Sequence, residues 1–147
     1  MFVGSKKRAV IEQFMKRVNW GGIDYLLVDL APGVAEETIE IIEVFKKDIS
    51  GVIVVTTPSH LSINSVKKII RLCEIKKMKV FGVISNMTGL VCPHCDKQIN
   101  VFGSYELVSD MCKKFSLSVL AVIPVIPQVE IKPFRVISYF KGVLDVI

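Results

Sequence analysis

Apolar residues along the chain follow two patterns. In some segments they recur at the spacing of an amphipathic helix, and in others they run almost unbroken, as in a strand covered on both faces. The first pattern predicts helices over residues 6–18, 36–47, 62–77 and 105–115, and the second predicts strands over 25–30, 51–56, 80–85 and 119–123. The last segment, 136–147, also has a helical period, but its Gly142 and β-branched residues favour a helix poorly.

This alternation of strands and helices predicts the α/β class, with a parallel β-sheet, flanking helices and right-handed crossovers. A length of 147 residues is typical of one domain with its own core. We therefore expect residues 1–147 to form a single domain. The sequence contains no internal repeat, linker or low-complexity segment.

Composition and charge narrow the class of protein. Hydrophobic residues make up 51% of the chain and charged residues 22%, which excludes disorder. No apolar run reaches the roughly 20 residues that span a bilayer. The first residues place their positive charges after a very short apolar piece, which is the reverse of the order in a secretory signal. We expect a cytoplasmic protein with reduced thiols and no membrane partner.

The net charge of +5 comes from lysines scattered along predicted helices, such as Lys67 and Lys68. A solvated helix face accounts for them better than a nucleic-acid groove does, because no basic stretch is interleaved with aromatic residues on a loop or sheet face. We expect no nucleic-acid partner.

The pair Cys92 and Cys95 is the most informative feature for chemistry, because it follows the predicted strand 80–85 and therefore lies on a loop. Two thiolates at this spacing suit half of a zinc site or half of an iron–sulfur site. The chain has no second pair at this spacing, and Cys73 and Cys112 fall on predicted helices, where their spacing to the pair is uninformative. The missing ligands must therefore come from elsewhere, and a symmetric dimer would supply them. A redox pair, or two loop cysteines without a role, is the alternative.

Other candidate residues follow the predicted strands, where the working groups of this fold class gather. Asp29, at the tip of strand 25–30, suits the water shell of Mg²⁺, with a helix cap or a salt bridge as the alternative. Gly33 allows the backbone to approach a phosphate closely. Asn86 suits the edge of a purine, although an asparagine that closes a turn is at least as common.

Together these segments resemble the Mrp/ApbC family of iron–sulfur carrier ATPases. The matching motifs follow in order at residues 20–21, 24–33, 54–58, 82–87, 92–95, 102–103 and 123–124. The resemblance covers about residues 5–127 and implies a P-loop NTPase fold related to the bacterial division ATPase MinD. It implies a homodimer that encloses two ATP molecules and shares a [4Fe–4S] cluster, which is delivered to apo iron–sulfur proteins.

The resemblance also implies roles for single residues. Asp29 matches the Walker B acid, which holds the water shell of Mg²⁺, and Gly33 matches the switch glycine near the γ-phosphate. Asn86 and Pro124 match positions at the nucleotide, and the two cysteines of the loop 88–103 match the cluster ligands.

The chain departs from the family where phosphates are bound. It contains no GKS or GKT, and it opens at the helix that in the family precedes the Walker B strand, so the P-loop strand region is lacking. Ala31 and residues 34–36 also replace family residues, as do residues 104–106. Because phosphoryl transfer depends on positioned positive charge, we expect the chain alone neither to bind Mg-ATP usefully nor to hydrolyse it.

The sequence thus predicts a partial Mrp-type domain that binds a [4Fe–4S] cluster, or zinc, through Cys92 and Cys95. Its expected partners are a second copy or a complementary P-loop-bearing chain, and apo iron–sulfur proteins. A truncated or split-gene interaction module without catalysis, or a fragment with structural zinc, is the alternative. In the related folds the P-loop strand lies between strands 25–30 and 51–56, so both strands would face a gap of unpaired backbone groups.

Overall fold

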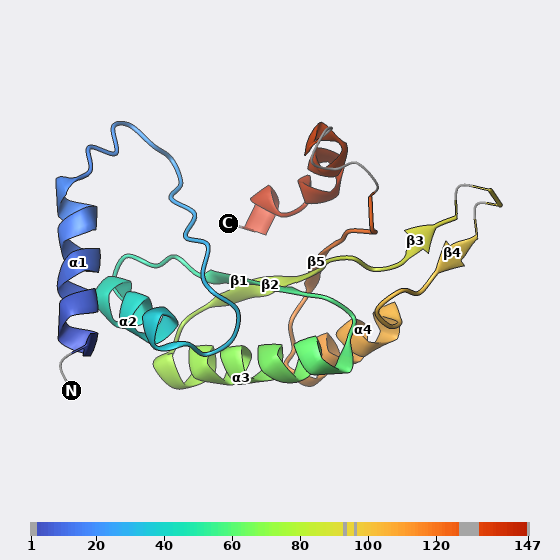
Figure 1. The fold of residues 1–147 in the computed structure, drawn as a ribbon, viewed down its shortest axis with the longest axis horizontal. Helices are drawn as coiled ribbons and strands as arrows, with labels where there is room; N and C mark the ends of the chain where they lie inside the picture. Colours follow the sequence, from blue (N-terminus) through green and yellow to red (C-terminus); the bar gives the residue numbers. More distant parts are fainter. Residues whose placement is uncertain (1–2, 93, 96, 127–132, 147) are drawn as a thin grey trace. The chain divides into compact units, whose positions relative to one another are not determined.

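The computed structural model describes residues 3–92, 94–95, 97–126 and 133–146 (Figure 1). The chain divides into two compact units, of which the first ends at Ile49 and the second begins at Ser50. None of the helices in the described ranges is long and apolar enough to cross a membrane.

The first unit holds two α-helices, α1 (Val3–Arg17) and α2 (Glu36–Phe45), which contact each other. The chain turns back at the end of α1, where the indole N–H of Trp20 donates to the Met15 carbonyl at 3.1 Å. The Trp20 and Phe14 rings meet edge to face, with their centroids 5.7 Å apart. The helices predicted over 6–18 and 36–47 are therefore confirmed.

The strand predicted over 25–30 is wrong, because these residues form no strand in the first unit. Their apolar side chains are exposed, with Tyr25 at 60%, Leu27 at 80% and Val28 at 53%. An apolar run has the composition of a strand, but a strand also needs a neighbour that takes its backbone hydrogen bonds. The first unit offers no such strand among its described residues.

The second unit contains a three-stranded parallel sheet in the order β1-β2-β5, formed by β1 (Val52–Thr56), β2 (Val80–Ser85) and β5 (Val119–Val122). Helix α3 (His60–Lys76) joins β1 to β2, and α4 (Tyr105–Lys114) precedes β5. The predicted α/β class with a parallel sheet is confirmed. Within the described residues β1 pairs with β2 alone.

Both faces of the central strand β2 are covered, which explains its unbroken apolar run. Val83 is fully buried against α3 and α4, which lie along one face of the sheet in Figure 1. Its neighbour Ile84 belongs to a second cluster, because successive strand residues point to opposite faces. The first cluster comprises Val54, Ile63, Val66, Ile70, Val83, Val108, Met111 and Cys112, and the second comprises Ile84, Ala121, Ile123 and Val143.

The last segment forms short 3-10 helices, η1 (Pro133–Phe140) and η2 (Leu144–Val146), where the sequence predicts a helical segment over 136–147. Gly142 and the β-branched residues lower the α-helix propensity here, and 3-10 geometry is common in short pieces. Val143, between the two helices, packs into the second core cluster. The final residue of the predicted segment lies outside the described residues.

Candidate metal-binding hairpin

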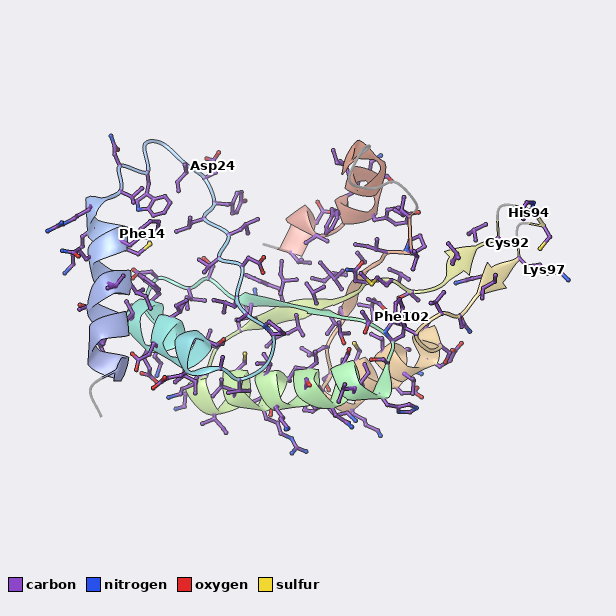
Figure 2. The ribbon with its side chains drawn as sticks, in the orientation of Figure 1. Phe14, Asp24, Cys92, His94, Lys97 and Phe102 are labelled. Atoms are coloured by element: carbon purple, nitrogen blue, oxygen red, sulfur yellow. The ribbon has the colours of Figure 1, made fainter. Side chains whose placement is uncertain are left out.

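The cysteine pair lies at the tip of a small β-hairpin in the second unit. Strands β3 (Leu90–Val91) and β4 (Gln98–Ile99) pair antiparallel. The Cys92 N–H donates to the Lys97 carbonyl at 2.9 Å and so extends the pairing by one step toward the tip. Figure 2 shows Cys92, His94 and Lys97 together at this tip. The prediction that the cysteines lie on a loop is confirmed, and Pro93 lies outside the described residues.

Hydrogen bonds anchor the base of the hairpin to the sheet. The Ile123 N–H donates to the Ser85 carbonyl, and the Thr88 N–H donates to the Ile123 carbonyl, each at 2.8 Å. The Val125 N–H donates to the Gly89 carbonyl at 2.8 Å. The buried hydroxyl groups of Ser85 and Thr88 pair at 2.6 Å. The hairpin therefore extends from a fixed base at the ends of β2 and β5.

Two glycines fix the path of the chain into and out of the hairpin. Gly89 has φ +79°, and a Cβ there would overlap the side-chain amide of Gln98. Gly103 has φ +146°, and a Cβ there would overlap the carbonyl oxygen of Pro58. Both positions have a left-handed φ that favours glycine, and at Gly103 the close approach of the Pro58 backbone adds to this preference.

The tip thiols are accessible, whereas the other two are not. All four cysteines are free thiols, with Cys95 exposed, Cys92 half-buried, and Cys73 and Cys112 buried. Burial raises the pKa of the Cys73 and Cys112 thiols, because it penalises the thiolate form. The core thiols are therefore poor metal ligands, and the tip pair alone among the cysteines suits a metal.

Local hydrogen bonds favour the thiolate form of Cys92. The backbone N–H of His94 is the main cause that lowers the pKa of the Cys92 thiol, followed by the backbone N–H and the side chain of Cys95. A lowered pKa makes a cysteine a better nucleophile and a better metal ligand near neutral pH. The groups that follow Cys92 thus favour its thiolate, which is the form of cysteine that binds metals.

One chain brings two accessible thiols to the tip of this hairpin. Over the part of the chain that the structure describes, no group of three or more His, Cys, Asp and Glu side chains is placed to hold a metal ion. Tetrahedral zinc and cubane clusters commonly take four protein ligands. Cys92 and Cys95 therefore amount to half of such a set.

The other predicted site residues fall in both units. Asn86 directly follows β2, and its side-chain oxygen accepts from the Met87 N–H at 3.0 Å, which leaves its NH₂ group as a donor. Pro124 follows the neighbouring strand β5. Asp29, which is exposed, and Gly33, with φ +85°, lie in the first unit. Asp29 does not end a strand, because the predicted strand is not formed. The roles of these four residues stay predictions.

Sequence reasoning missed a hollow of about 670 Å³ beside the hairpin. Its described lining residues are Thr88, Gln98, Asn100, Tyr105, Glu106 and Val122. They come from the hairpin, the start of α4 and the end of β5, so no local motif marks them. A hydrogen bond with the Ser104 side chain lowers the pKa of the Glu106 carboxyl, which keeps it ionised at neutral pH.

Curated relatives with iron–sulfur names match most of this chain. The cytosolic Fe-S cluster assembly factor NUBP2 homolog of Dictyostelium discoideum is 41% identical over 140 residues, which cover 93% of this chain and 52% of that protein. The cytosolic Fe-S cluster assembly factor CFD1 of Candida glabrata is 41% identical over 126 residues, which cover 85% of this chain and 44% of that protein. The chain thus spans about half the length of these relatives.

Solved structures agree on the fold. A nucleotide-binding protein of Archaeoglobus fulgidus, in complex with ADP, has a TM-score of 0.72 and 31% identity, with 84% of this chain and 49% of that chain covered. The cell division protein MinD of Aquifex aeolicus, at 18% identity, has a TM-score of 0.58 with 97% of this chain and 57% of that chain covered. The MinD-like fold is therefore confirmed.

The family follows from a match across most of the sequence. The family model described as NUBPL iron-transfer P-loop NTPase, of the ParA type, matches residues 1–133. This agrees with the Mrp/ApbC resemblance of the sequence motifs and with the names of the relatives. The chain belongs to the family of NUBPL iron-transfer P-loop NTPases.

Proposed function

We propose that this chain carries a [4Fe–4S] cluster on Cys92 and Cys95 and delivers it to apo iron–sulfur proteins. The observation that supports this best is a pair of accessible free thiols at the tip of an anchored hairpin, with the pKa of Cys92 lowered by local N–H groups. The family description names iron transfer, and the relatives quoted above are named Fe-S cluster assembly factors.

The proposed cluster is shared between two chains. Each chain contributes two thiolates, and a cluster of this type takes four. An isologous contact between two copies brings the same patch of each together, so two hairpin tips supply all four ligands. A complementary chain that carries a P-loop and its own thiols is the other arrangement that meets this requirement.

Delivery would proceed by ligand exchange. A thiolate of the acceptor bonds to iron as Cys92 or Cys95 leaves it, and the released thiolate takes up the proton that the acceptor thiol lost. One Fe–S bond forms for each that breaks, so no electrons are transferred. Cys95 is the more exposed of the two thiols, which makes its bond to iron the more accessible to an incoming group.

Nucleotide contacts belong to the same proposal. Asp29 would hold the water shell of Mg²⁺ and Gly33 would lie near the γ-phosphate, with Asn86 and Pro124 at the nucleotide base. Most phosphate affinity comes from a glycine-rich loop, and residues 1–147 contain no GKS or GKT. We expect the chain alone to bind Mg-ATP with a dissociation constant weaker than about 100 μM, as measured by calorimetric titration. Tighter binding would contradict this expectation.

The proposed compartment is the cytoplasm. Thiols must stay reduced to ligate iron, and the cytosol maintains that condition. The quoted relatives are named cytosolic factors, and the cysteines of this chain are free thiols.

Anaerobic reconstitution with iron and sulfide, followed by visible absorbance and iron counting, tests the proposal. We expect the wild-type chain to gain iron and a cluster spectrum, and the Cys92→Ser, Cys95→Ser variant to lose both. The matched control is Cys73→Ala, Cys112→Ala, which removes two thiols from the core and should keep the iron. Iron retained by the tip variant, or binding of zinc alone at the tip, would overturn the proposal.

A further inference from the structure

The hollow beside the hairpin is polar and carries one ionised group. Its lining offers the amides of Gln98 and Asn100, the phenol of Tyr105 and the carboxylate of Glu106. No Lys, Arg or His is among its described lining residues. The Ser104 side chain stabilises the ionised form of Glu106 by a hydrogen bond. On a chain with a net charge of +5, this hollow is therefore a local negative site.

Two amide side chains of the lining are available to a ligand. Over the described residues, no hydrogen bond joins the side chain of Gln98 or Asn100 to another residue. Their carbonyl oxygens accompany the Glu106 carboxylate, so the hollow offers several acceptors around one negative charge. A guanidinium group has five donors in a planar fork and also stacks on aromatic rings such as that of Tyr105.

The hollow is open to solvent. Its volume is about 670 Å³, and the residues Gln98, Asn100, Tyr105 and Glu106 are exposed. A segment of another protein can therefore reach the Glu106 carboxylate from solvent.

The position of the hollow relates it to the thiols. Gln98 pairs with Val91, the residue before Cys92, so the lining and the cysteine pair share one hairpin. We propose that the hollow binds an arginine-bearing segment of the protein that receives the cluster. The identity of this partner rests on the proposed function, whereas the arginine specificity rests on the lining alone.

Saturation-transfer difference NMR with two short peptides tests the inference, because it observes the peptide and does not require a small protein. The probes are acetyl-Gly-Arg-Gly-amide and its counterpart with uncharged citrulline. The protein is the full chain with Cys92→Ser and Cys95→Ser, so that metal plays no part. We expect the arginine peptide to bind about fivefold more tightly than the citrulline peptide, because an exposed ion pair contributes at most about 1 kcal/mol.

Charge neutralisation at two neighbouring carboxylates sharpens the test. In the same background, Glu106→Gln should weaken binding of the arginine peptide about fivefold, the upper end of what an exposed ion pair contributes. The matched control is Asp110→Asn, one turn along the same helix and outside the lining, which should change binding by less than about twofold. Equal binding of the two peptides, or no effect of Glu106→Gln, would overturn the inference. Failure of the wild-type chain to take up iron on reconstitution, with arginine binding retained in the double-serine variant, would overturn the proposed function alone.

Discussion

The hydroxyl oxygens of Ser85 and Thr88 lie 2.6 Å apart, both buried, in the turn that leads from β2 to the hairpin. Thr38 in α2 is a useful contrast, because its hydroxyl oxygen is buried without a hydrogen-bond partner in the described structure. The two threonines are 3% and 4% exposed, so a difference in burial does not account for a difference between them.

The same substitution should therefore have opposite effects at the two threonines. Thr88→Val leaves the Ser85 hydroxyl unpaired and should lower the free energy of unfolding by about 1–3 kcal/mol. Thr38→Val removes a buried polar group that has no partner, and should leave stability unchanged or raise it by about 1 kcal/mol. Urea unfolding of both variants measures the difference. Equal losses would show that the Ser85–Thr88 pair does not hold the base of the hairpin.

Gly103 should be the glycine that tolerates a side chain least. Gly103→Ala places a Cβ against the Pro58 carbonyl at a left-handed φ, and should cost about 2–3 kcal/mol of unfolding free energy. The matched control is Gly142→Ala, because no atom lies within 4 Å of its added Cβ. We expect that variant to stay within about 1 kcal/mol of wild type. Thermal unfolding that gives equal losses would contradict the close approach.

Some of the fold could be predicted from sequence because the signal was local. The run at 80–85 forms β2, and the helical stripe at 62–77 forms α3 almost to the residue. The similar run at 25–30 forms no strand, because pairing depends on a neighbour that periodicity does not show. Strands β3 and β4 are two residues each, too short to leave a periodic pattern.

The same distinction applies to the site. The spacing of Cys92 and Cys95 indicated a possible metal site from the sequence alone, because two cysteines three positions apart can bind one metal ion together. No sequence motif identifies the lining of the hollow, because Gln98 and Glu106 come together only when the hairpin and the start of α4 have folded. The lowered pKa of Cys92 likewise depends on backbone N–H directions that the sequence does not specify.

The exposed apolar run 25–30 should cause self-association of the metal-free chain. Light scattering should give a mass above the 16.4 kDa of one chain. Leu27→Lys, within the run, should lower that mass, whereas Leu61→Lys should not, although both leucines are 80% exposed. Leu61 stands between two polar residues, so it adds little to an apolar patch. A wild-type monomer with cooperative unfolding would contradict this prediction.

Cys92 should react with iodoacetamide before the two core thiols, Cys73 and Cys112. The lowered pKa of Cys92 means that its thiolate, the reactive form, is present at lower pH than that of an ordinary cysteine. The raised pKa and the burial of Cys73 and Cys112 should delay their reaction to higher pH or to unfolding. Peptide mass spectrometry after labelling across pH 6–9, about the ordinary thiol range, gives each profile. A Cys92 profile at or above the ordinary thiol range would refute the proposed N–H stabilisation.

The central claim is a cluster shared by the hairpin tips of two chains, and native mass spectrometry under anaerobic conditions tests it most directly. The Leu27→Lys variant is the suitable background, because association through the run 25–30 is then reduced. We predict that reconstitution converts monomers into dimers that carry one [4Fe–4S] cluster, and that Cys92→Ser with Cys95→Ser abolishes both the cluster and the dimer. A monomer that holds a complete cluster, or a dimer that forms equally without metal, would contradict the account.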